Sequence, residues 1–146
     1  MKRVEGAVLA AVALALIGSV PTAAATTRQI FPREGKPFSS AIRIGDMVYV
    51  SGVAGGAADG TYPADFATQA THAMNGVAAE LKLAGATMDD VYRCTIALTN
   101  MDDWATFNTV YVKYFKPGRY PVRMSFGVTS LGGAAVEVQC EAHLAK

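Results

Sequence analysis

Residues 135–144 read AVEVQCEAHL, and from Val136 onward apolar and polar side chains alternate. One face of this stretch carries Val136, Val138, Cys140, Ala142 and Leu144, and the other carries Glu137, Gln139, Glu141 and His143. A period of two is typical of a β-strand with one buried and one solvated face. The stretch therefore predicts a strand in a sheet that is covered on one face only.

Two helices are expected upstream of this strand. Residues 65–84 repeat apolar side chains at helical spacing, with Asp65 as a plausible N-cap and Gly85 as a plausible stop. Residues 103–115 form a second helix with an aromatic stripe, which we interpret as core; it consists of Trp104, Phe107, Tyr111, Tyr114 and Phe115.

Further strands complete the sheet. Residues 41–44 and 47–50 form a hairpin around Gly45-Asp46, a pair that suits a type II′ turn. Residues 91–99 and 121–128 are also expected to be strands, whereas 26–37 read as a loose lead-in and 54–60 as a loop. The order ββαβαββ predicts an α+β two-layer domain, with a mixed sheet and two helices on one face.

Composition excludes several classes of protein. The 146 residues are 51% hydrophobic and 17% charged, which is incompatible with a disordered chain and fits one domain. The formal net charge of +1 gives no electrostatic reason to expect nucleic acid as a partner.

Residues 1–25 have the three-part pattern of a signal peptide. Lys2 and Arg3 precede an apolar run that is too short to span a bilayer, and three alanines follow as a cleavage site. An uncleaved anchor or a buried helix is the alternative. Cleavage removes Lys2, Arg3 and Glu5, so 13 basic residues fall to 11 and 12 acidic residues to 11. We expect a neutral domain over residues 26–146 that is periplasmic or secreted and free of the membrane.

Cys94 and Cys140 lie on the apolar faces of two expected strands. In an oxidising compartment they could form a disulfide. Two buried free thiols are the alternative, because free cysteine is among the most buried residue types.

Two charged side chains stand inside apolar strands. Arg123 and Glu137 must each face water or find a partner. An arginine in a cleft binds carboxylates through two parallel hydrogen bonds, and a nearby carboxylate can position a water. A structural Arg–Glu ion pair, or two solvated charges, is the alternative. No metal or cofactor motif accompanies them, and we expect neither His72 nor His143 to bind a metal.

These residues stand in segments that resemble the RidA/YjgF family of enamine/imine deaminases. The segment around Pro121-Val122-Arg123, the glycines of 127–133 and Val136-Glu137-Val138-Gln139 are similar to the C-terminal signature of that family. The hairpin at 44–52 and the helical residues 104–111 are similar to the corresponding family segments. The resemblance extends from Pro37 to the C-terminus.

The resemblance implies a chorismate-mutase-like fold and a homotrimer with ligand clefts between subunits. Arg123 would hold the carboxylate of a small metabolite, with help from the backbone of Ser125, and Glu137 would orient the attacking water. Asn108, Ser51 and Gly52 would line the cleft. Phe38 would also bind the substrate, although it stands where many members have tyrosine, so that one hydroxyl contact is lost.

The sequence leaves three functions open. The first is an exported, cofactor-free deaminase that converts 2-imino or 2-enamino acids to 2-keto acids and ammonia. The second is a non-catalytic trimer that binds small carboxylates, since imino acids arise mainly in the cytoplasm. The third, nuclease or translation inhibition, conflicts with a neutral mature chain.

Overall fold

The computed structural model describes residues 26–144, and the predicted signal peptide at 1–25 lies outside them. Two α-helices, α1 (Phe66–Leu83) and α2 (Trp104–Tyr111), accompany seven strands. The strands are β1 (Arg28–Pro32), β2 (Ser39–Ile44), β3 (Met47–Val50), β4 (Val53–Ala54), β5 (Val91–Leu98), β6 (Val122–Gly127) and β7 (Val136–His143). Short 3-10 turns η1 (Met88–Asp90), η2 (Met101–Asp103) and η3 (Val112–Tyr114) flank β5 and α2. No helix within residues 26–144 is long and apolar enough to cross a membrane.

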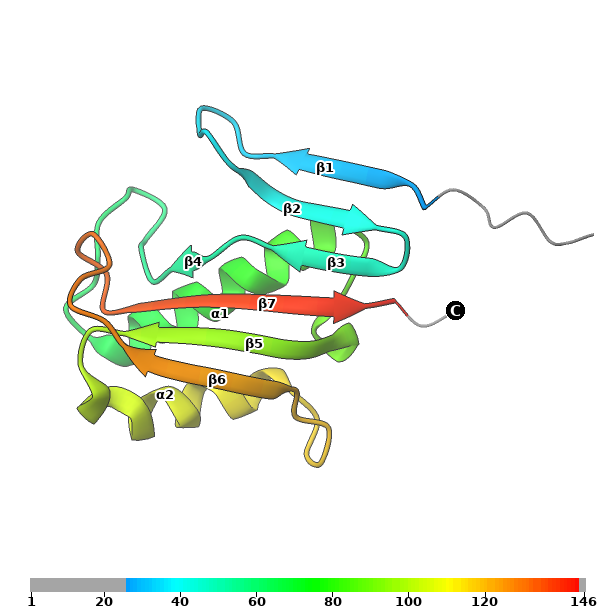
Figure 1. Ribbon diagram of the computed structural model, residues 1–146. Coiled ribbons are helices and arrows are strands. Elements are labelled where there is room, and N and C mark those ends of the chain that lie inside the picture. Colours follow the sequence, from blue (N-terminus) through cyan, green and yellow to red (C-terminus); the bar gives the residue numbers. More distant parts are fainter. Residues whose placement is uncertain (1–25, 145–146) are drawn as a thin grey trace, which may run out of the picture.

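The strands form one mixed sheet in the order β1-β2-β3-β7-β5-β6, and β4 also pairs with β7. The β5–β6 pair is parallel, and the other pairs are antiparallel. Both helices lie on the same side of the sheet, which leaves its other face open (Figure 1). The architecture is therefore the expected α+β two-layer domain with a mixed sheet and two helices on one face.

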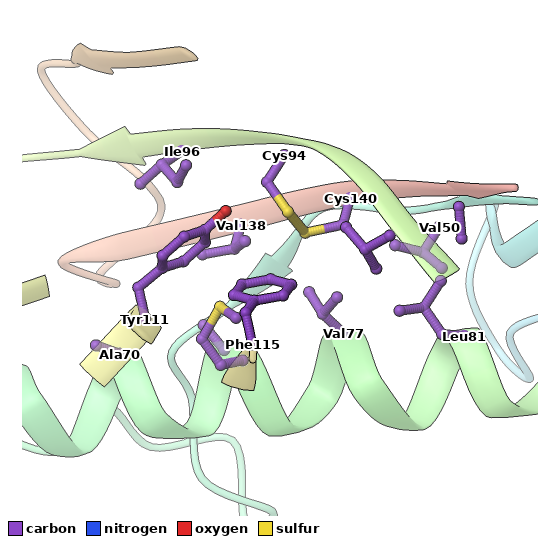
Figure 2. Close-up of a cluster of buried hydrophobic side chains, with 14 of the residues drawn as sticks. Val50, Ala70, Val77, Leu81, Cys94, Ile96, Tyr111, Phe115, Val138 and Cys140 are labelled. Atoms are coloured by element: carbon purple, nitrogen blue, oxygen red, sulfur yellow. A yellow bond between two sulfur atoms is a disulfide. The ribbon is translucent and has the colours of Figure 1, made fainter. Parts of the chain in front are cut away.

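The core lies between α1 and the sheet. Helix α1 begins at Asp65, whose carboxylate accepts a 2.7 Å hydrogen bond from the backbone N–H of Thr68, and it ends before Gly85, whose φ is +82°. Both helix ends therefore lie within a residue of the prediction. Figure 2 shows Val77 and Leu81 of α1 pointing toward the sheet, where Cys140 of β7 and Val50 of β3 lie opposite them. All four side chains are fully buried.

The hairpin formed as expected. Ile44 pairs with Met47 across Gly45-Asp46, and the positive φ falls on Gly45, as a type II′ turn requires. The first strand is a correction, because the segment at 26–37 contains β1 where a loose lead-in was predicted. Strand β1 is an exposed edge strand joined to β2 by backbone hydrogen bonds, so it carries no apolar alternation that a sequence pattern could detect.

Cys94 and Cys140 form a disulfide between β5 and β7. The two residues face each other directly in the antiparallel register, and both side chains are buried in the core (Figure 2). The sequence could not decide between a disulfide and two buried free thiols, because only the strand register determines which residues stand opposite one another.

Candidate active site

The two charged residues from apolar strands lie on opposite faces of the sheet. In the parallel β5–β6 register, Arg123 stands beside Cys94, whose side chain is in the core, so Arg123 faces the helix layer. Glu137 alternates with the buried Val136 and Val138 and therefore points to the open face. The predicted alternative of an Arg123–Glu137 ion pair is thus wrong within one chain, and no such pair occurs within residues 26–144.

Two aromatic rings of α2 flank the Arg123 side chain. The guanidinium carbon lies 4.5 Å from the ring centroid of Trp104 and 4.9 Å from that of Tyr111. Both distances are typical of cation–π contacts, and a planar guanidinium stacks well on such rings. Within the described chain, Arg123 forms no ion pair with a carboxylate. Its N–H groups therefore remain available to an anionic ligand.

A cavity of about 240 Å³ opens beside Arg123, and Asn108 and Tyr111 also line it. Three buried oxygens in this region have no hydrogen-bond partner, namely Oδ1 of Asn108, the hydroxyl of Tyr111 and Oγ of Ser125. Ser125 lies two residues after Arg123 on the same strand and so on the same face. An unpaired buried polar group costs about 1–3 kcal/mol, and native proteins contain few. The two of these residues that line the cavity, Asn108 and Tyr111, indicate a place where a ligand completes the hydrogen bonding.

Glu137 belongs to a second hollow, of about 570 Å³, on the open face of the sheet. Ser51 and Gly52, which follow β3, line the same hollow. A Cβ on Gly52 would overlap Oε1 of Glu137, so the missing side chain gives the carboxylate its position. Ser51 is fixed by two hydrogen bonds, from its Oγ to the carbonyl of Ser39 at 2.8 Å and from its N–H to the carbonyl of Ser40 at 2.9 Å.

Phe38 precedes Ser39, which lines the hollow beside Glu137. The Phe38 residue is 47% exposed. The guanidinium of Arg33 lies 5.5 Å from the centre of the Phe38 ring. Arg33 also donates a 3.2 Å hydrogen bond to Oγ of Ser40 and pairs with the buried Glu80 of α1. The loop that carries Phe38 is thus tied to the helix layer.

The seven predicted site residues therefore form two separate groups within one chain. The open face of the sheet carries Ser51, Gly52 and Glu137, and Phe38 precedes a residue that lines the same hollow. The helix side carries Asn108, Arg123 and Ser125. Sequence reasoning missed Trp104 and Tyr111 as neighbours of Arg123, because it assigned the whole aromatic stripe to the core. Their spacing of seven residues, two helical turns, was the available signal.

Comparison with known proteins identifies the family of this chain. A family model described as endoribonuclease L-PSP matches residues 29–144. The chain belongs to the RidA/YjgF family. It is 31% identical over 106 residues to 2-iminobutanoate/2-iminopropanoate deaminase of Bos taurus, covering 70% of this chain and 77% of that protein. It is also 35% identical over 108 residues to the RutC family protein YjgH of Escherichia coli strain K12, covering 73% of this chain and 82% of that protein.

Solved structures of RidA/YjgF relatives have the same fold. Rv2704 of Mycobacterium tuberculosis, a member of the YjgF/YER057c/UK114 family, superimposes with a TM-score of 0.70 at 30% identity, covering 81% of this chain and all of that one. The Rid family protein YyfA of Yersinia pestis superimposes with a TM-score of 0.74 at 28% identity, covering 81% of this chain and 100% of that one. Residues 26–144 contain no cluster of three or more histidine, cysteine or acidic side chains that could hold a metal ion.

Proposed function

We propose that this protein is a hydrolytic deaminase of 2-imino acids and their 2-enamino tautomers, releasing a 2-keto acid and ammonia. The observation that carries the proposal is the Arg123 guanidinium, which forms no ion pair within the described chain, contacts two aromatic rings and lines a cavity with Asn108. Such a rigid fork suits a substrate carboxylate. Relatives at about this identity are named as deaminases of 2-iminobutanoate and 2-iminopropanoate.

The reaction needs few groups from the protein. The oxygen of a water bonds to the imine carbon of the protonated substrate, and the electron pair of the C=N bond moves to nitrogen. The water loses a proton and the nitrogen gains one. The C–N bond then breaks to release ammonia while the new hydroxyl loses its proton and the C=O bond forms. Arg123 fixes the carboxylate, and Glu137 orients the water and carries the proton, a role for which a positioned carboxylate is suited.

A homotrimer brings the two halves of the site together. Because Arg123 and Glu137 lie on opposite faces of one sheet, one chain cannot direct both at one substrate. The open face also exposes large apolar side chains, with Val122 69%, Met124 53% and Phe126 43% exposed. A contiguous apolar sheet face of this kind is typical of an interaction surface. In the proposed assembly, one subunit contributes Asn108, Arg123 and Ser125 to each site. Its neighbour contributes Ser51, Gly52 and Glu137.

Light scattering is expected to give three times the mass of the mature chain at micromolar concentration. Met124→Glu should shift the mass toward the monomer, because it introduces a charge on the open face. Glu34→Gln, an exposed change on the loop after β1, is the matched control and should leave the mass unchanged. A monomeric wild-type protein would contradict the trimer and remove the composite site with it.

Export is the second part of the proposal. The disulfide between Cys94 and Cys140 supports it, since disulfides persist in oxidising compartments and are rare in reducing ones. Intact-mass measurement of protein from the periplasmic or secreted fraction should give a chain that begins near Thr26. Recovery of the full-length chain from the cytoplasm as the sole product would contradict export.

The decisive experiment measures ammonia released from freshly generated 2-iminopropanoate by the mature protein. Release above the uncatalysed rate that falls strongly in Arg123→Ala would support the deaminase. Binding of pyruvate without any acceleration would support the alternative, a non-catalytic trimer that binds small carboxylates.

A further inference from the structure

Tyr111 carries a buried hydroxyl that neither the fold nor the seven predicted site residues explain. We infer that this hydroxyl donates a hydrogen bond to the carboxylate of the ligand held by Arg123, which makes Tyr111 a further binding residue. The inference rests on the proposed function, because it takes the Arg123 cavity as the place where a carboxylate binds.

Burial is the first observation behind this inference. Tyr111 is 2% exposed, and its hydroxyl has no hydrogen-bond partner within the described chain. Tyr114, on the next helical turn, shows what a purely structural tyrosine does here. Its hydroxyl donates to Oδ1 of Asn75 at 2.8 Å and reaches the carbonyl of Thr71 at 3.2 Å. Buried tyrosine hydroxyls usually find such a partner, so the unpaired one on Tyr111 calls for a partner from outside the chain.

The position of the ring is the second observation. Figure 2 shows Tyr111 between the helix layer and the sheet, with its oxygen turned toward the sheet. The same ring stacks on Arg123 and lines the 240 Å³ cavity with it. Ser125, whose Oγ is also unpaired, stands beside Ile96 in the β5–β6 register. The hydroxyl thus lies in the layer where Arg123 and Ser125 face the helices.

The chemistry of the group fits a carboxylate ligand. Burial raises the pKa of Tyr111 to about 12, and the positive charge of Arg123 opposes this shift without cancelling it. The phenol therefore stays protonated at neutral pH and can donate. Tyr111 and Arg123 both line the cavity, so the phenol adds a donor to those of the guanidinium, which is what an anion with two oxygens requires. Hydrogen bonds that are unmade in the free protein form in the complex after small side-chain shifts.

Tyr111→Phe tests the inference because it removes one oxygen and keeps the ring that stacks on Arg123. We expect pyruvate to bind about tenfold more weakly, the usual effect of losing one hydrogen bond to a charged group. Thermal unfolding of the ligand-free variant should occur at the same temperature or higher, because the variant no longer buries an unpaired hydroxyl. The matched control is Tyr114→Phe, which should unfold at a lower temperature and bind pyruvate as the wild type does.

The outcomes separate this inference from the proposed function. Wild-type affinity in Tyr111→Phe, with binding lost in Arg123→Ala, would overturn the role of Tyr111 and leave the carboxylate site standing. Wild-type affinity in both variants would overturn the site itself. A lowered unfolding temperature in ligand-free Tyr111→Phe, with affinity unchanged, would mean that the hydroxyl serves the fold instead.

Discussion

Replacing Arg123 by Ala is expected to lower kcat/KM for 2-iminopropanoate by a factor of about 10²–10³. The variant loses a charge-assisted, bidentate contact to the substrate carboxylate, and no other residue that lines the cavity carries a positive charge. The fold should survive, because Arg123 is exposed on an edge strand and forms no ion pair within residues 26–144. Steady-state ammonia release and pyruvate titration by calorimetry measure the effect.

Arg123→Lys is the informative companion to this variant. It keeps the positive charge but loses the planar fork and the flat face that stacks on Trp104 and Tyr111. We expect it to recover only a small part of the lost kcat/KM. Arg119→Ala, which removes an exposed arginine from the loop before β6, is the matched control and should behave as wild type. Arg123→Ala with undiminished turnover would contradict the carboxylate clamp.

Much of the layered fold was predictable because its signals are local. The alternation along β7 placed Glu137 on the solvated face, and the helical spacing of 65–84 located α1 between its N-cap Asp65 and Gly85. These patterns depend on residues near one another in sequence, where the period of the apolar side chains decides the element.

The composite site depends on register and could not be predicted in the same way. The sequence identified Arg123 and Glu137 as exceptional charges in apolar strands. That they face opposite sides of the sheet follows from pairing β6 and β7 to β5, which no local pattern specifies. The Cys94–Cys140 disulfide has the same origin. The cation–π contacts of Trp104 were hidden because an aromatic stripe looks the same whether it covers a core or an arginine.

Glu137→Gln is the second prediction with a large expected effect, and it separates a catalyst from a binding protein. The change keeps the shape of the side chain and one oxygen acceptor but removes the charge and the capacity to carry a proton. A deaminase should lose a factor of about 10²–10⁴ in kcat, the usual contribution of a general acid–base group, while pyruvate still binds. A binding protein without catalysis should hardly change, or should bind the anion slightly better because a negative charge is gone.

Displacing the same carboxylate without altering it gives an independent route to this result. Gly52→Ala places a methyl group where Oε1 of Glu137 lies, so the carboxylate must move away from its water-orienting position. We expect kcat to fall with little change in pyruvate affinity, as in Glu137→Gln. Gly56→Ala is the matched control, since its new methyl group meets the edge of the exposed Tyr62 ring at 3.3 Å and nothing of Glu137. If both Glu137→Gln and Gly52→Ala lost the trimer or the fold while Gly56→Ala kept them, Glu137 would be a structural residue of the subunit contact. Retained assembly with lost turnover in the first two variants would assign the hydrolytic step to this carboxylate.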